Sequence, residues 1–216
     1  MKLEVKAGVK ENLIRSAIEV FAQQGYRGGK IADIVKGAGA NIAAVNYHFG
    51  SKDKLFVAAL RQAHRKADEI YPSSGSLAED ANAKEKIGAA ARAILRRSFD
   101  AGVAGDFNRI MSRTMNVVGS PIEMILEEVE QLELKHISTV IAEFLNTTSE
   151  QMISWGVAVF LSLATMVSKC PAGVVNKIFQ SEGEERPSES QIDAMIQSQI
   201  NAIFVALDSL PKNLPA

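Results

Sequence analysis

The sequence predicts an all-α protein with a small N-terminal three-helix domain and a larger C-terminal helical domain. Two observations indicate this fold class. Apolar residues recur at helical spacing nearly everywhere, and no alternating pattern bounded by turn dipeptides marks a strand. The length of 216 residues allows a small domain joined to a medium one, each with a buried core. We place the boundary between residues 1–50 and residues 51–216.

The first helix is expected over the segment that ends at Gly25. Leu13, Ala17 and Phe21 fall on one face at helical spacing, while polar residues such as Glu19 lie opposite. Glycine commonly ends a helix because it adopts backbone conformations that other residues avoid. We therefore expect an amphipathic helix that packs one face on its neighbours.

Two short helices are expected next, with a tight turn between them. Residues 31–38 carry a short apolar stripe that Gly39 ends. Asn41 is then a good N-cap for a third helix, and Val45 and Phe49 share one face of it, so we expect both in the core. Helices this short are unstable alone, so packing must hold them in place.

A longer fourth helix is expected to begin after Ser51, an N-cap without a capping box, and to run to about Ile70. Pro72–Asn82 has the composition of a loop. The pattern beyond it predicts helices near 84–103, 106–117, 121–145, 149–169 and 189–209. Ser120-Pro121 is a helix start signal, and 171–188 is expected to be a polar loop with a turn around 174–179.

Charge is divided unevenly along the chain. Residues 1–66 hold 12 Lys and Arg against 5 Asp and Glu, a net charge of +7, whereas residues 67–216 hold 12 against 20, a net charge of -8. A basic segment on an acidic body suggests a module that binds a polyanion, although basic helices are often merely solvated.

Composition also excludes several classes of protein. The single cysteine, Cys170, excludes an intrachain disulfide framework, and the N-terminus has no apolar signal region, so we expect a cytoplasmic protein. No apolar run approaches the roughly 18 residues of a membrane span. No catalytic or metal-ligating constellation is recognisable, so we predict neither an enzyme nor a bound cofactor or metal.

Two short helices joined by a glycine-containing turn, with a helix before them, are the sequence form of a helix-turn-helix. The stretch AQQGYRGGKIADIVKGAGANIAAVNYHFGSKDKL, residues 22–55, resembles the DNA-binding domain of the TetR family, whose pattern reads FA-x-x-GY-x-x-TT-x-x-DIA-x-x-AGVS-x-x-x-LY-x-HF-x-SK-x-x-L. The resemblance is AcrR-like, and NIAAVNYHFGSK is similar to members grouped around a cephalosporin-resistance regulator. It covers about the first quarter of the chain.

The resemblance implies that residues 41–48 form the recognition helix in the major groove of DNA. The residues expected at the DNA are Lys30, Asn41, Ile42, Ala43, Ala44, Asn46, Tyr47, His48 and Lys52. Residues 42–44 match base-reading positions, where such small apolar side chains suit thymine methyl groups, with DNA shape supplying the rest. Asn46 suits adenine, and Tyr47, His48 and Lys52 match phosphate contacts.

The sequence departs from the family pattern at several positions. Gly29 and Lys30 stand where two threonines are usual, so the hydroxyl cap and its phosphate contact are absent. Lys30 is expected to supply that contact as a point charge. Asn46 replaces a common tyrosine, and Asn41 replaces a common serine, which keeps the cap but changes the contacts.

The C-terminal body offers a possible inducer site. The residues proposed to line it are Phe107, Met111, Met115 and Trp155, although for any one of them ordinary helical core is the commoner role. Arg109 and Arg113 could meet an anionic inducer, but salt bridges to Glu127, Glu128, Glu130 and Glu133 are the more common arrangement. His64 and Asp68 are interpreted as a surface pair.

The last two long helices have broad apolar faces, which predict a homodimer through a four-helix bundle, and the same pairing occurs in the family. The faces comprise Ile153, Val157, Phe160, Leu161 and Ala164, and Ile192, Met195, Ile196, Ile200, Ile203, Phe204 and Leu207. The resulting prediction is a dimeric repressor on a palindromic double-stranded operator, released by an unknown small-molecule inducer. The alternative is a helical enzyme or scaffold that kept a degenerate DNA-binding head.

Overall fold

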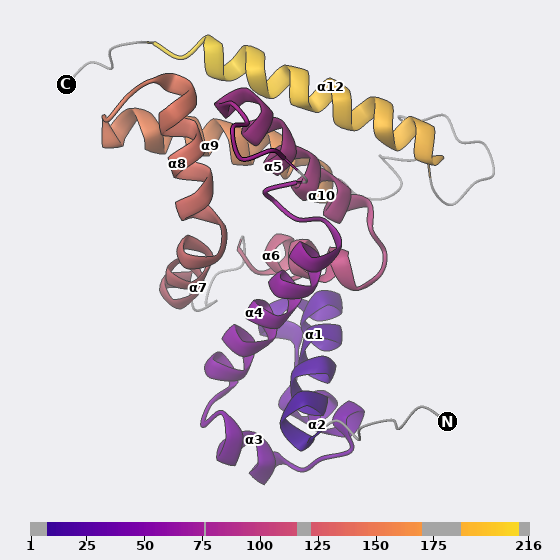
Figure 1. The fold of residues 1–216 in the computed structure, drawn as a ribbon. Helices are drawn as coiled ribbons and strands as arrows, with labels where there is room; N and C mark the ends of the chain where they lie inside the picture. Colours follow the sequence, from indigo (N-terminus) through magenta and orange to yellow (C-terminus); the bar gives the residue numbers. More distant parts are fainter. Residues whose placement is uncertain (1–7, 76, 116–121, 170–186, 212–216) are drawn as a thin grey trace. The chain divides into compact units, whose positions relative to one another are not determined.

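The computed structural model describes residues 8–75, 77–115, 122–169 and 187–211, and every regular element in these ranges is helical (Figure 1). The predicted all-α class is therefore confirmed. The elements are α1 (Val9–Gly28), α2 (Ile31–Ala38), α3 (Ile42–His48), α4 (Lys52–Ile70), α5 (Ala83–Phe99), η1 (Val103–Gly105), α6 (Asp106–Thr114), α7 (Ile122–Val129), η2 (Glu130–Leu134), α8 (Lys135–Leu145), α9 (Glu150–Ala164), α10 (Met166–Lys169) and α12 (Glu189–Asp208).

Contacts divide the chain into two compact units, and neither is one continuous stretch of sequence. The first unit comprises Met1–Ala67 and Ala101–Val129, and the second comprises Asp68–Asp100 and Glu130–Ala216. The first unit thus adds α6 and α7 to the helices before residue 67. The DNA-binding domain boundary at residue 50 stays a prediction.

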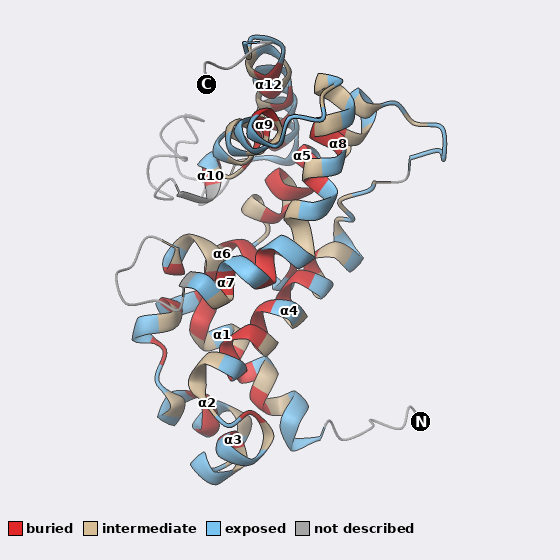
Figure 2. Ribbon diagram, turned by 90° about the vertical axis from the view of Figure 1, so that its left-hand side faces the viewer, coloured by how far each residue is buried: buried red, intermediate tan, exposed pale blue. Residues whose placement is uncertain are grey.

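The core of the first unit is built from the apolar stripes that the sequence predicts. Leu13, Ala17 and Phe21 of α1 are fully buried, and Phe21 packs edge-to-face on Phe56 of α4 with 4.9 Å between ring centroids. Figure 2 shows buried residues along the facing sides of α1 and α4. Helix α6 also packs on α1, with Ile110 buried.

Helix α1 is broken at Gly25. The helical assignment continues to Gly28, but Gly25 has φ 67° and ψ 179°, a conformation that is essentially restricted to glycine. A Cβ on Gly25 would lie 2.9 Å from the carbonyl oxygen of Arg113 in α6. The predicted stop at Gly25 therefore marks a real break, although one further turn follows it.

The core of the second unit is formed by α5, α8, α9 and α12. Ile94 and Leu95 of α5, Ile141 of α8 and Phe160 of α9 are buried together. On α12, the buried positions recur every three or four residues: Ile192, Ile196, Ile200, Ile203 and Leu207. The side of α12 predicted to pair with a second chain is thus largely buried within its own unit.

Arg97 of α5 is fully buried in the second unit and joins three segments. Its Nη1 donates to Glu133 in η2 at 2.8 Å. Its Nη2 lies 2.8 Å from Asp68, near the end of α4, and also reaches the Tyr71 carbonyl at 2.8 Å and Ser73 Oγ at 3.0 Å. One buried cation therefore compensates two carboxylates and caps the turn after α4.

Several predicted helix limits are wrong. The helix expected over 84–103 ends at Phe99, because Asp100 has extended geometry and a separate 3-10 turn, η1, follows. The helix expected over 149–169 is interrupted at Thr165, whose hydroxyl donates to the Leu161 carbonyl at 2.7 Å. Residues 122–145 are helical as expected, but η2 is a π-helical segment within them.

Other expectations concern parts of the chain outside the described residues. These are the Ser120-Pro121 start signal, the turn around 174–179 and Cys170. Within the described residues, no helix is both long enough and apolar enough to cross a membrane.

Candidate nucleic-acid interface

Helices α2 and α3 form the helix-turn-helix that the sequence predicts, with the predicted limits. Gly39 ends α2 in the left-handed conformation, with φ 61°. The N–H groups of Gly39 and Ala40 donate back to the carbonyls of Lys36 at 3.3 Å and Val35 at 2.9 Å. These two bonds satisfy carbonyl groups of the last turn of α2. A turn of only three residues therefore separates α2 from α3.

Buried contacts fix α3 and α2 on the rest of the unit. Val45 is 2% exposed and Phe49 9% exposed, so the predicted core roles of both are confirmed. Ser16 Oγ of α1 donates to the Ile34 carbonyl at 2.8 Å, and a Cβ on Gly37 would overlap that hydroxyl. A short helix held this way presents its opposite face in one orientation.

The outward face of α3 is mainly apolar. Ile42 is 56% exposed and Tyr47 85% exposed, and Ala43 and Asn46 are also exposed. At about 100° per residue, these four positions span roughly 140° of the helix surface. Ala44 and His48 border this face and are partly exposed. Every residue predicted at the DNA from α3 therefore has surface available for contact.

The N-cap of α3 is the one predicted. The Asn41 side-chain oxygen accepts the Ala44 N–H at 2.9 Å. The Asn41 amide N–H groups, which the cap does not use, can donate to DNA. The contribution of Asn41 to DNA binding stays a prediction.

Lys52 opens α4 and is held against an aromatic ring. Its Nζ lies 4.5 Å from the centroid of the Tyr26 ring, within the range of a cation–π contact. The Tyr26 hydroxyl in turn donates to Asp53. Neither Tyr26 nor Asp53 is among the predicted site residues. Tyr26 matches the family pattern, and Asp53 follows the matched Lys52. Together they position Lys52, since its ammonium group lies on the Tyr26 ring and Asp53 accepts the Tyr26 hydroxyl.

The contacts among Tyr26, Lys52 and Asp53 accompany shifts in the pKa of Tyr26 and of Lys52. Burial, the hydrogen bond to Asp53 and the charge of Asp53 raise the pKa of Tyr26 to about 12. Burial lowers the pKa of Lys52, while Asp53 acts in the opposite direction. Tyr26 is thus kept as a neutral phenol that can donate its hydrogen bond.

Gly29 and Lys30, the departures from the family pattern, lie before α2. Lys30 is exposed at the N-cap position and makes no side-chain cap, as expected. A Cβ on Gly29 would lie 2.7 Å from the ring of Phe21. The glycine is therefore required by core packing, a reason that the sequence pattern does not reveal.

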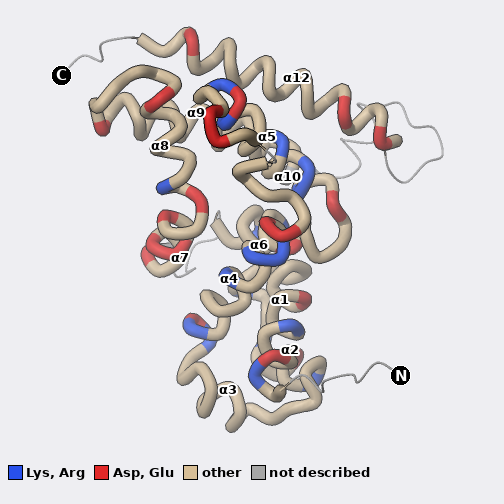
Figure 3. Tube along the Cα trace, viewed as in Figure 1, with Lys and Arg blue, Asp and Glu red and all other residues tan. Residues whose placement is uncertain are grey.

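Basic side chains surround this part of the first unit. Three lysine side chains are exposed: Lys30 directly before α2, Lys36 within α2 and Lys54 in the first turn of α4. Figure 3 shows Lys and Arg on α2 and at the start of α4, whereas α7 and α12 carry Asp and Glu. The +7 charge of residues 1–66 thus includes cations near the helix-turn-helix.

The four residues proposed for an inducer pocket do not belong to one unit. Phe107, Met111 and Met115 are in the first unit, with Phe107 3% exposed. Trp155 is in the second unit and is 48% exposed. A cavity of about 380 Å³ between α1, α4 and the turn before α6 is lined by none of these four residues. Their role in ligand binding stays a prediction.

Some residues expected in salt bridges between α6 and the next helix also have other partners. Arg109 pairs with Asp106 on its own helix at 2.8 Å. Glu128 instead forms a two-bond ion pair with Arg61 of α4, at 2.6 and 2.7 Å. Glu133 pairs with Arg97. The expected pairs of Arg109 and Arg113 with acidic residues of the next helix stay a prediction.

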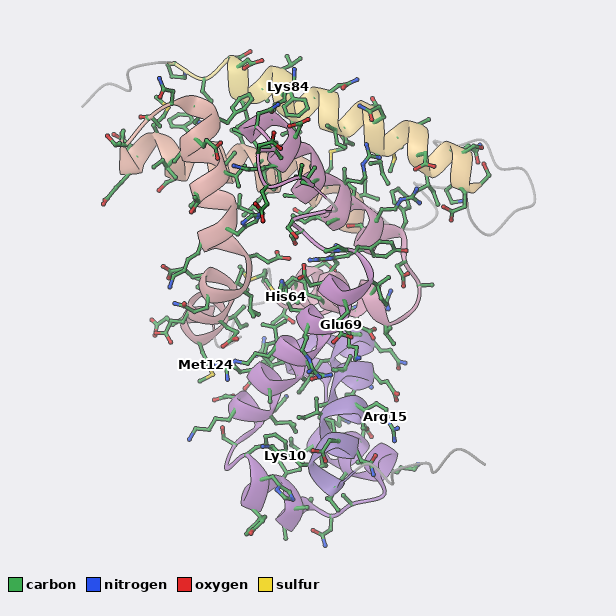
Figure 4. All side chains as sticks on the ribbon, viewed as in Figure 1. Lys10, Arg15, His64, Glu69, Lys84 and Met124 are labelled. Atoms are coloured by element: carbon green, nitrogen blue, oxygen red, sulfur yellow. The ribbon has the colours of Figure 1, made fainter. Side chains whose placement is uncertain are left out.

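The surface pair predicted for His64 and Asp68 is also wrong. His64, labelled in Figure 4, is 9% exposed. Its ring packs edge-to-face on Phe107, with 5.0 Å between ring centroids. Asp68 bonds Arg97. The apolar surface of α6 covers His64, which the spacing within α4 alone could not indicate.

Comparison with known proteins identifies this region. Residues 13–59 match the family model described as "Bacterial regulatory proteins, tetR family". This segment of the chain is thus similar to the tetR family of bacterial regulatory proteins. A similar protein is the HTH-type transcriptional repressor NicS of Pseudomonas putida, 39% identical over 51 residues, which are 24% of each chain. The matched segment thus spans about a quarter of that relative.

Solved structures extend the likeness in fold over most of the chain. A transcriptional regulator from Rhodococcus sp. Rha1 has a TM-score of 0.60 at 20% identity and covers 94% of this chain and 99% of its own. The regulator FadR from Bacillus subtilis, solved with stearoyl-CoA, has a TM-score of 0.61 at 15% identity, with 89% and 96% covered. The likeness in fold therefore extends beyond the matched segment to the second unit.

Proposed function

We propose that this protein is a transcriptional repressor that binds a palindromic operator as a homodimer and is released by a small-molecule inducer. The observation that carries the proposal is that buried side chains anchor α3 while its opposite face, which includes Tyr47, is exposed. Lys52, held on the Tyr26 ring at the start of α4, lies a few residues further along the chain. A helix of this size and exposure fits the major groove of DNA. The relatives named as repressors support the same function.

The proposed contacts fall into two classes. Lys30, Tyr47, His48 and Lys52 would bind phosphates and so set the position of the domain without reading sequence. Asn46, near the centre of the exposed face of α3, would pair with adenine through its amide. Ala43 and Ala44 would allow close approach of the helix to the bases.

The decisive experiment is a gel shift with the promoter upstream of the protein's own coding sequence. Sequence-selective retardation that weakens with salt is expected. Lys52→Ala or Tyr47→Ala should weaken binding to every DNA sequence, and removing the charge of Lys52 from a phosphate should lower the slope of log affinity against log salt by about 0.9. Asn46→Ala should instead relax selectivity at one base pair, by about 1–3 kcal/mol.

The matched control is Lys84→Ala, which removes one exposed lysine from the second unit. It should leave both affinity and salt slope unchanged. Equal affinity of the wild-type protein for the promoter and for unrelated DNA would rule out the proposal.

Dimerisation is proposed through the outward sides of α9 and α12. The apolar faces that the sequence predicts for this role are mostly covered, since Phe160, Ile196 and Ile203 lie in the core. Among the exposed residues, each helix carries a narrow strip of small or apolar side chains with one amide: Trp155, Ala158 and Ser162 on α9, and Ala194, Ser198, Asn201 and Val205 on α12. Each set falls within about 60° of its helix surface, so two copies could pack closely across a two-fold axis.

An inducer is proposed because FadR, a structural neighbour, was solved with stearoyl-CoA. Binding to the C-terminal body would favour dimers whose two recognition helices no longer match half-sites about one DNA turn apart. A thermal-shift screen of metabolites, acyl thioesters and antibiotics would identify it. A compound that raises the melting temperature should also release the gel-shifted DNA, and stabilising compounds that never do so would contradict induction.

A further inference from the structure

The first turn of α3 carries only hydrocarbon on its outward side. Ile42 and Ala43 are exposed there, and the side-chain oxygen of the preceding Asn41 is bonded to the Ala44 N–H. Residues at the N-terminal end of a recognition helix are those that contact base edges. Apart from the Asn41 amide N–H groups, the side chains available for reading bases at this end are therefore apolar.

Ile42 contributes little to holding α3 in place. It lies in the first turn and is 56% exposed, whereas Val45 and Phe49, later in the helix and at its end, are 2% and 9% exposed and anchor it. Its neighbour Ala43 is too short to keep the helix away from a groove floor. A branched aliphatic side chain is thus presented where the helix can approach DNA most closely.

We infer that Ile42 determines specificity by contacting the C5-methyl group of a thymine in each operator half-site. This inference rests on the proposed function and names the base that part of the site reads. Among the four bases, only thymine presents a methyl group in the major groove. At any other base, Ile42 would cover a polar edge without offering it a hydrogen bond, which is unfavourable.

The test uses the operator found in the gel-shift experiment. Its thymines are replaced one at a time by deoxyuridine, which differs from thymidine only by that methyl group. One position per half-site should lose affinity about fourfold, the factor expected for one methyl group in an apolar contact. Replacing the same T·A pair by 5-methylcytosine·guanine should give tighter binding than unmethylated cytosine·guanine.

Protein variants assign the effect to Ile42. In Ile42→Ala, affinity for the thymine operator should fall, and the penalty for deoxyuridine at that position should shrink from about fourfold to less than about twofold. Circular dichroism and melting temperature should match the wild type, since Ile42 is exposed. Val103→Ala is the control, because Val103 is 57% exposed in the same unit but lies off α3.

The outcomes separate this inference from the proposed function. Selective operator binding that is insensitive to deoxyuridine at every position overturns the inference and leaves the repressor proposal standing. Sensitivity that persists unchanged in Ile42→Ala also overturns it, because another residue then reads the methyl group. Absence of any selective binding overturns both.

Discussion

Tyr26 carries a cation against its ring and a carboxylate at its hydroxyl. The neutral phenol is favoured by burial, by the hydrogen bond to Asp53 and by the Asp53 charge, which raise the pKa of Tyr26 to about 12. Because the folded pKa lies above the ordinary value of about 10, the stabilisation is complete below about pH 10. It is lost as pH rises from about 10 through about 12.

A spectrophotometric titration of tyrosinate absorbance tests this expectation. The difference between wild type and Tyr26→Phe should show one phenol that ionises near pH 12. In Asp53→Asn the transition of Tyr26 should move toward lower pH, because the hydrogen bond to the carboxylate and its charge are both removed. A difference curve centred at the ordinary tyrosine value would contradict the arrangement.

Gly25 is expected to tolerate substitution less well than Gly39. In Gly25→Ala, the backbone strain costs about 1–3 kcal/mol and the new Cβ crowds the Arg113 carbonyl at 2.9 Å. Gly39→Ala should cost less, because its left-handed conformation is accessible to other residues and its Cβ would meet nothing within 4 Å. Urea denaturation of both variants gives the comparison, and equal losses would contradict it.

At the level of single residues, the sequence predicted those roles that depend on local pattern. The N-cap at Asn41 and the anchors Val45 and Phe49 follow from spacing and residue type, and all three are confirmed. The need for glycine at position 29 follows instead from the ring of Phe21, which lies earlier in the chain and beyond the break in α1. Such a contact exists only once the helices are packed.

We expect the packing of the helices around Arg97 to be stabilised by the charge of its guanidinium group. Arg97→Met should lower the free energy of unfolding by about 3–5 kcal/mol, because Glu133 and Asp68 would lose their buried partner. Arg96→Met is the control. Arg96 pairs with Glu189 and Asp193 at the surface, where both acids are more than half exposed, so a loss below about 1 kcal/mol is expected.

Denaturant unfolding of both variants measures these losses. Combining Arg97→Met with Glu133→Gln and Asp68→Asn should recover part of the stability, because no uncompensated charge then remains. A loss in Arg97→Met no larger than that in Arg96→Met would show that the buried guanidinium is not what holds the segments.

At the level of elements, short helices with strong end signals were predicted to the residue, while long ones were not. The limits of α2 and α3 follow from Gly39 and Asn41. The end of α5 and the π-helical turns of η2 carry no local signal. η2 places Glu133 at Arg97, and π-helical turns are maintained by such tertiary contacts.

For the whole molecule, Trp155 offers a direct measurement of assembly. It is the only tryptophan in the sequence and is 48% exposed on the proposed dimer side of α9. Its fluorescence emission should shift to shorter wavelength as protein concentration rises through the dimer dissociation constant. Ser162→Arg, on the same side of α9, should remove the shift, whereas Thr139→Arg on α8 should not. An emission maximum independent of concentration in a protein that sediments as a dimer would place the interface elsewhere.

For the whole molecule, the sequence allowed a prediction of function only from the first quarter of the chain. The match to the tetR family model lies in residues 13–59. The rest of the chain has only 15–20% identity with solved structures of similar fold, so its spacing predicted helices but not which side chains form a pocket.

The discontinuous first unit has a consequence for protein engineering. Helix α1 packs along α6, and the Tyr26 N–H donates to Thr114 Oγ1 at 3.3 Å, so a graft of residues 8–67 alone would expose that side of α1 to water. A chimaeric biosensor that borrows the proposed DNA specificity should therefore transplant residues 101–129 together with the helix-turn-helix. Splice points chosen by sequence similarity alone would cut through one folding unit.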